Sequence, residues 1–381
     1  MKRSTRRLVA RWPASLCLTA VLTVAGWPAP AAADPFARPQ PWCQLPEAPG
    51  DVRCPEEQLF DEIGAGPVAV ALTSHRFDQL EADFAQWCSS GERRRDGQWR
   101  LVDFRRGVDR VLRQNRQSDW SGVLTAWRQA FPESVALRLA EATGMTRGYR
   151  TDPSDRAGES PEARLLTRQA GARAWSLLQA DVEGAGPVCP AVDEVALRAL
   201  AMMEVDPATM RAAYDRAIKR SGSYVPLHQV MATHLYRQSG SWDEHDRFID
   251  ASDRRLSEAG ESGLFARLHG AATLGRLHRA VKQGATKTTV PSRSITTADA
   301  SAHWNRLASS YSALEARWPR SYSLLNGYAG AACLAGDASR YLPLREKLEP
   351  YRRWLAFPEA VDVCDLRTGY LAPDLRPPAM K

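Results

Sequence analysis

Three histidines are the side chains that first raise the possibility of a metal site, because they fall in one short stretch. His228 and His234 are six residues apart, which places them on different faces of a helix, where they could not share one ion. Glu244-His245 lacks the upstream histidine of the inverted zinc motif, and no His-Glu-x-x-His sequence occurs. We therefore expect histidines that are packed with hydrogen bonds or lie at the surface, with no metal and no cofactor.

Glutamates could instead carry acid catalysis on a glycan, since some exported lytic enzymes are built from helical superhelices. Such an acid needs an apolar cleft that raises its pKa. Glu81, Glu141 and Glu315 fall within predicted helices, but each fits an ordinary polar face. No two carboxylates stand at a recognisable catalytic spacing, and the Gly-x-Ser-x-Gly motif of serine hydrolases is absent. The sequence therefore indicates no catalytic residue.

The first 33 residues have the order of a secretory signal peptide. A basic start without acids leads into an apolar run at 16–27 and then into small residues ending at Ala33. The pattern predicts cleavage between Ala33 and Asp34, and the apolar run is too short to span a membrane. The residues at 5–7, Thr-Arg-Arg, leave twin-arginine export open beside the general secretory route. We expect a periplasmic or secreted protein without membrane insertion after cleavage.

Loss of the signal peptide also removes most of the charge excess. The chain has 51 basic and 44 acidic residues, a net charge of +7, and five of the basic residues but none of the acidic ones lie in the signal. The remainder has 46 basic and 44 acidic residues. A surface so close to neutrality gives no electrostatic reason to expect nucleic-acid binding.

An even number of cysteines follows the signal peptide, which in an exported protein predicts disulfides. No Cys-x-x-Cys pair occurs, which argues against a zinc ribbon or a thioredoxin-type site. Of the fifteen possible pairings we predict one: a short tie across a Pro-rich segment, a bond from the C-terminal tail to the last hairpin, and a middle pair left by elimination. These bonds are Cys43–Cys54, Cys333–Cys364 and Cys88–Cys189.

A helical period of apolar residues begins at residue 76 and continues to about 350, with no sustained period-2 run. Local signals divide it into helices: Asp119 is expected to cap a helix from Trp120, Ser134 to cap one from Val135, and Pro161 to open another. Further helices are expected near 99–113, 192–203, 207–219, 226–240, 262–283, 299–316, 320–335 and 337–349. The prediction is an all-α protein of paired helical hairpins.

This reading divides the chain into four parts: the signal peptide at 1–33, a Pro-rich extended N-terminal arm at 34–75, a helical-repeat domain at 76–350 and a tail at 351–381 packed on the last hairpin. Loops are expected at 64–67 and 184–187, each Gly-Ala-Gly-Pro. Within the repeat domain, an aromatic residue near a proline is followed three times by an apolar helix, a Gly-containing break and another helix. Pro132, Pro226 and Pro319 are 94 and 93 residues apart, a spacing that favours stacked hairpins of α-solenoid type.

Several short motifs support the solenoid interpretation. They are Phe77-x-x-Leu80-Glu81, Asp96-Gly97-x-Trp99-x-Leu101, Trp127 with Pro132 and Ser134, Arg147-Gly148, Gly222-x-Tyr224-x-Pro226-Leu227-His228, Leu235-x-Arg237 and Gly240-Ser241. Together they resemble an uncharacterised bacterial family of tetratricopeptide-like helical proteins, a domain of unknown function, over roughly 77–349. The chain departs from that family at Tyr236 and Gln238, where the family has proline and tryptophan. The resemblance implies a helical-repeat fold and no established chemistry.

Four residues are candidates for a binding surface. Trp242 follows Gly240-Ser241 beside Arg237 at a predicted hairpin turn, and an aromatic with an arginine at a solenoid loop is typical of binding surfaces. The alternative for Trp242 is a hydrophobic staple over a helix start. Arg147 and His228 belong to motifs that resemble the family. We expect an exported binding or scaffold protein for a protein or peptide on a concave face, with a periplasmic enzyme acting on cell-wall glycan as the alternative.

Overall fold

A computed structural model describes most of the predicted helical region. It describes residues 56–94, 97–114, 117–147, 149, 159–184, 189–239, 242–258, 263, 265–269, 297–317, 322–348 and 364–365. Regular structure in these ranges is helical, apart from one isolated bridge between Arg93 and Trp99. The all-α prediction is therefore confirmed for this part of the chain. The predicted signal peptide and its cleavage position at Ala33 and Asp34 lie outside the described residues.

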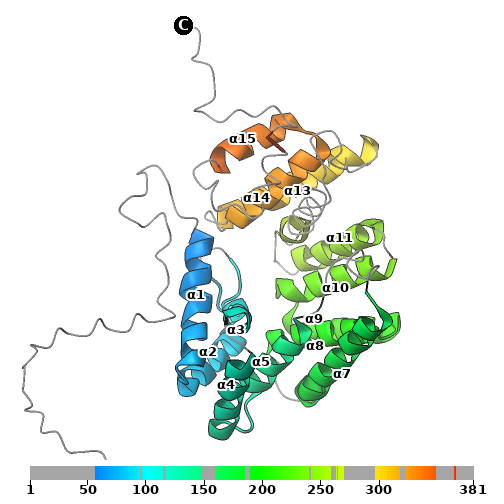
Figure 1. Cartoon of the computed structure of the whole chain (residues 1–381). Coiled ribbons are helices and arrows are strands. Elements are labelled where there is room, and N and C mark those ends of the chain that lie inside the picture. Colours follow the sequence, from blue (N-terminus) through cyan, green and yellow to red (C-terminus); the bar gives the residue numbers. More distant parts are fainter. Residues whose placement is uncertain are drawn as a thin grey trace, which may run out of the picture. The chain divides into compact units, whose positions relative to one another are not determined.

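Figure 1 shows the helices of the described residues. They are α1 (Glu56–Thr73), α2 (Phe77–Ser90), α3 (Leu101–Gln114), α4 (Gln117–Ala130), α5 (Val135–Thr146), α7 (Pro161–Glu183), α8 (Pro190–Met203), α9 (Pro207–Ser221), α10 (Val225–Ser239), α11 (Trp242–Glu258), α13 (Thr297–Arg317), α14 (Tyr322–Ala335) and α15 (Ala338–Leu348). Residues 265–269 are also helical. Every described residue belongs to one unit, Gln40–Lys381.

Local capping chemistry sets several helix starts. The Ser134 hydroxyl accepts a hydrogen bond of 2.8 Å from the Leu137 amide, so the predicted cap of α5 is confirmed. Pro161 opens α7 as predicted, where its missing N–H costs nothing. The cap predicted at Asp119 is wrong, because α4 begins at Gln117 and Asp119 lies in its first turn. An acidic residue is favourable there too, so it marks a helix start only to within a few residues.

The predicted extended arm is wrong for residues 56–73, and the loop predicted at 64–67 is wrong, because α1 occupies these positions. Helix α1 runs through Pro67, and its buried face packs against α3. Gly107 of α3 allows the close approach: a Cβ there would lie 2.4 Å from Cγ1 of Val68 and 2.9 Å from the Ala65 carbonyl oxygen. Burial of this face outweighs the local loop preference of glycine and proline. Residues 34–55 of the predicted arm lie outside the described residues.

Helix α8 is the centre of the packing. Its residues are buried from Pro190 to Met202 except for Arg198, and it contacts α7, α5, α9 and α10. Gly171 of α7 permits the tightest of these approaches, since a Cβ there would lie 2.8 Å from the Ala199 carbonyl oxygen. Helix α3 in turn packs against α1 and α5. A helix buried on nearly all faces must satisfy its charged residues internally, which explains the ion pairs described below.

The three prolines of the proposed repeat do not hold one common place. Pro132 stands three residues before α5, and α14 likewise begins three positions after Pro319, which itself lies outside the described residues. Pro226 is instead the second residue of α10. Both places tolerate proline because the backbone N–H is not needed there. The near-constant spacing therefore does not reflect one constant position of the proline relative to a helix start. The Phe-Pro-x-Ser and Trp-Pro-x-Ser sequences do have the same position, each with its proline three residues before a helix.

Two of the predicted disulfides are present. Cys88, near the end of α2, is bonded to Cys189, the N-cap residue of α8, with their Cα atoms 4.9 Å apart. Cys333 of α14 is bonded to Cys364 with a Cα separation of 5.5 Å. The third predicted pair, Cys43–Cys54, lies outside the described residues. Disulfides persist in oxidising compartments, so these two bonds are typical of a protein outside the reducing cytosol.

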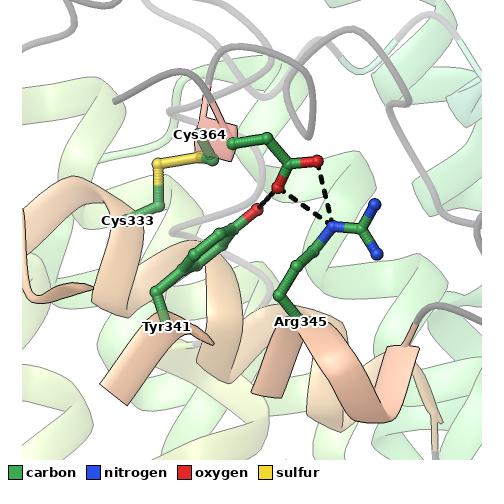
Figure 2. The surroundings of a disulfide bond; sticks show 5 residues. Cys333, Tyr341, Arg345 and Cys364 are labelled. Carbon is green, nitrogen blue, oxygen red and sulfur yellow. Dashed lines mark hydrogen bonds and ion pairs between the residues drawn. A yellow bond between two sulfur atoms is a disulfide. The ribbon is translucent and has the colours of Figure 1, made fainter. Parts of the chain in front are cut away.

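An ion pair supports the second disulfide (Figure 2). Asp365, the neighbour of Cys364, accepts a hydrogen bond of 2.6 Å from the Tyr341 hydroxyl and bonds of 3.0 and 3.1 Å from Nε of Arg345. Arg345 is 1% exposed, so water cannot stabilise its positive charge and the Asp365 carboxylate does so instead. The described part of the C-terminal tail is thus held on α14 and α15 both covalently and by charge.

Candidate binding site

Arg237 has the most unusual environment among the four predicted binding residues. It lies in the last turn of α10, and its guanidinium carbon is 4.5 Å from the ring centroid of Tyr149, in cation–π geometry. Its Nε and Nη1 atoms are buried, and no described residue accepts a hydrogen bond from them. Buried polar groups in proteins are normally paired, so this guanidinium has unused capacity for a ligand.

His234 lies one turn earlier on the same face of α10, because residues three apart are neighbours on a helix. Its side chain is buried, with the residue 4% exposed, and no described residue bonds to its Nε2. Burial, together with the positive charge of Arg237, lowers the pKa of His234 to about 4. The imidazole is therefore neutral near pH 7, where Nε2 can donate or accept according to the tautomer.

The remaining predicted residues lie at different distances from this site. Arg147 is the C-cap residue of α5 and donates a hydrogen bond of 2.9 Å from Nη1 to the Leu112 carbonyl, and Tyr149 follows it by two residues. Arg237 thus lies against the segment that carries Arg147. Trp242 is the first residue of α11, but its side chain lies outside the described residues. The site therefore joins the end of α5 to the end of α10.

His228 is a core residue and not part of a surface. It is 2% exposed, with Nδ1 at 2.8 Å from the Tyr214 hydroxyl and Nε2 at 2.6 Å from the Gly222 carbonyl oxygen. Its ring packs edge-on against Tyr214. Burial lowers the pKa of His228 to about 4. Its prediction as a binding residue is wrong, while the expectation of hydrogen-bonded packing holds for it.

This buried histidine predicts a dependence of stability on pH. The unfolded side chain takes up a proton near pH 6.5, whereas the folded one does so only near pH 4. Stability from this residue is therefore complete above about pH 6.5 and declines toward pH 4. Between pH 7.5 and 5, we expect the wild type to lose about 2 kcal/mol more free energy of unfolding than His228→Gln. Urea unfolding at pH 7.5 and 5 measures this; equal losses in both proteins would contradict it.

Sequence reasoning missed Tyr149 and His234 as members of this site. Tyr149 is separated from Arg237 by 88 positions, so no local pattern links the two. His234 carried a usable signal, because it stands three residues before Arg237 in a predicted helix. The spacing of three residues places His234 and Arg237 on one helix face, whereas the spacing of six places His228 and His234 on different faces.

The three glutamates considered for acid catalysis all hold structural partners. Glu81 accepts hydrogen bonds from Nε1 of Trp127 and from the Ser134 hydroxyl, and so fixes the cap of α5. Glu141 pairs with Arg128. Glu315 is exposed, with its carboxylate 3.6 Å from Nζ of Lys347. None of them stands in the apolar surroundings that an acid catalyst requires.

A fourth glutamate, missed in the sequence, is fully buried. Glu194 of α8 has no exposed side-chain surface; Nη2 of Arg198 lies 2.6 Å and Nε of Arg105 3.3 Å from its Oε1, and the Tyr224 hydroxyl donates to Oε2 at 2.9 Å. Burial alone would raise the pKa of Glu194, but the charges of Arg105 and Arg198 hold it below its usual value. It is an ionised carboxylate that links α3 to α8 and is unsuited to donate a proton.

The described residues also limit two other classes of site. No group of three or more His, Cys, Asp or Glu side chains among them could hold a metal ion. In the same ranges, no helix combines the length and the apolar character needed to cross a membrane.

Comparisons with protein-family models, curated proteins and solved structures found no match to this chain. Functional assignment therefore rests on the geometry at Arg237, His234 and Tyr149.

Proposed function

We propose that this chain is an exported helical-repeat protein that binds a protein or peptide at the site formed by Arg237, His234 and Tyr149. The observation that carries the proposal is the guanidinium of Arg237, whose Nε and Nη1 are buried without an acceptor among the described residues. Buried charged donors without acceptors destabilise a folded protein unless a ligand supplies the missing acceptors. Arginine and tyrosine together are also the side chains most typical of binding hot spots.

Several features support the rest of the proposal. The N-terminal sequence has the order of a signal peptide, and the two disulfides fit an oxidising compartment. Consecutive helices such as α7 and α8, α10 and α11, and α14 and α15 pack against one another, as in tetratricopeptide-like hairpins. The motifs that resemble the tetratricopeptide-like family fall within this helical region. The proposed partner is a protein or peptide, and its binding involves no cofactor.

The alternative, an enzyme acting on cell-wall glycan, has no specific observation in its favour. Glu81, Glu141 and Glu315 are engaged with neighbours, and Glu194 is held ionised by two arginines. A glycan-cleaving acid needs the opposite environment, one that favours the protonated form.

Binding of the oxidised full chain to an array of peptides with diverse sequences tests the proposal. We expect saturable binding to a subset of peptides, with micromolar dissociation constants, and weaker binding of that subset by Arg237→Gln. Purified peptidoglycan is the contrasting substrate, and we expect no product release from it. Release of soluble fragments, together with no peptide bound by the wild type, would overturn the proposed function.

A further inference from the structure

Several arginines of the described residues have the kind of partner that Arg237 lacks, a carboxylate of the same fold. They are Arg94 with Asp103, Arg105 with Glu194, Arg138 with Asp181, Arg220 with Asp193 and Arg345 with Asp365. Arg138 shows the preferred geometry, because Nε and Nη2 donate to the two oxygens of Asp181 at 2.9 and 2.7 Å. Nε and Nη1 of Arg237 are also buried, but no carboxylate of the described residues accepts a hydrogen bond from them.

The geometry of the guanidinium makes a carboxylate the matching ligand group. A planar guanidinium presents two edges that can bind a carboxylate with parallel hydrogen bonds, Nε with Nη2 and Nη1 with Nη2. Both Nε and Nη1 of Arg237 are buried and lack an acceptor among the described residues, so a carboxylate bound at either edge would supply an acceptor that the fold does not. Stacking on Tyr149 restrains the plane of the group, so little side-chain entropy remains to be lost on binding.

His234 adds a second polar side chain on the same face of α10. Its Nε2 is buried, and no described residue occupies it. The tautomer that carries its proton on Nε2 can donate a hydrogen bond to the second oxygen of a carboxylate, or to a neighbouring carbonyl of the same peptide. Among the described residues, Nε2 of His234 has no partner and Nε and Nη1 of Arg237 have no acceptor, and the two residues are neighbours on one face of α10.

We propose that Arg237 and His234 bind a carboxylate of the peptide ligand, with Tyr149 holding the guanidinium in place. This inference rests on the proposed function, because it identifies the chemical group that the same site recognises. The carboxylate can come from the C-terminus of the peptide or from an aspartate or glutamate side chain. Both sources share the chemistry, and the experiment separates them.

The test uses peptides from the array that bind the wild type, resynthesised in neutral forms. One form carries a C-terminal amide, and the others replace each Asp or Glu by Asn or Gln. We expect one of these changes to weaken binding by about 10-fold or more, which identifies the source of the carboxylate. Arg237→Gln should weaken binding of the parent peptide by a similar factor and should bind the neutral peptide as the wild type does, since coupled partners are not additive.

A second variant and a control protect this test from effects on folding. Arg237→Lys keeps the charge over Tyr149 but loses the planar pair of donors, so we expect a smaller loss than in Arg237→Gln. Arg173→Gln, at an exposed arginine of α7, should bind as the wild type does. Thermal unfolding of all variants shows whether the fold is kept.

Three outcomes would overturn the inference while leaving the proposed function intact. The first is wild-type binding that survives neutralisation of every carboxylate. The second is additive losses from Arg237→Gln and from the neutral peptide. The third is a requirement for a phosphorylated residue. If the wild type binds no peptide at all, the proposed function itself has failed.

Discussion

We expect the double substitution Cys88→Ser with Cys189→Ser to lower the free energy of unfolding by about 4–5 kcal/mol. The bond joins residues that are 101 positions apart, so it restricts a long loop in the unfolded chain. In the folded chain it ties α2 to the N-cap residue of α8, a helix buried on nearly all faces. Urea unfolding of the oxidised wild type and of the variant, at one pH and temperature, gives the difference.

The second disulfide provides the matched control. Cys333 and Cys364 are 31 positions apart, so Cys333→Ser with Cys364→Ser should cost less, between about 3 and 4 kcal/mol. A reversed order of the two losses would show that effects of the bonds on the folded state outweigh the restriction of the unfolded chain. An unchanged midpoint for the first variant would refute the prediction outright.

Glu194→Gln is expected to destabilise the fold by about 3 kcal/mol. The substitution keeps the shape of the side chain but removes its charge, so Arg105 and Arg198 remain near each other without their shared carboxylate. Glu194 has no exposed side-chain surface, so water cannot replace the lost interaction there. Both arginines keep some solvent contact, at 19% and 25% exposure, which places the cost at the lower end for a broken buried pair.

Glu204→Gln is the control for this second prediction. Glu204 pairs with Arg168, whose side chain is 54% exposed, and a pair of this kind contributes under about 1 kcal/mol. Chemical denaturation of the two variants side by side compares a buried charge with an exposed one. Equal losses would mean that the link from α3 to α8 depends on packing alone.

Helix starts could be predicted from the sequence because the interactions that set them are local. Ser134 bonds to the amide three residues later, and Pro161 needs no partner for its missing N–H. Helix α1 could not be predicted in the same way. Its course through Pro67 depends on a close contact between Val68 and Gly107 of another helix, which local preference does not reveal.

The candidate site was predictable only at Arg237. Helices α7, α8 and α9 lie between Tyr149 and Arg237 in the sequence, and nothing in the short sequence around either residue indicates their contact. Glu194 was overlooked for the same reason. In the sequence it reads as a polar residue of an amphipathic helix, and its burial follows from packing of α8 on several sides.

The two disulfides also have a consequence for how the chain acquires its bonds. No other cysteine lies between Cys88 and Cys189, or between Cys333 and Cys364. Each bond therefore joins cysteines that are consecutive in the sequence, and the two loops neither overlap nor interlock. Thiols that oxidise in the order in which they are synthesised can form both native bonds directly. Oxidative maturation of this region thus requires an oxidant but no isomerase to exchange mispaired bonds.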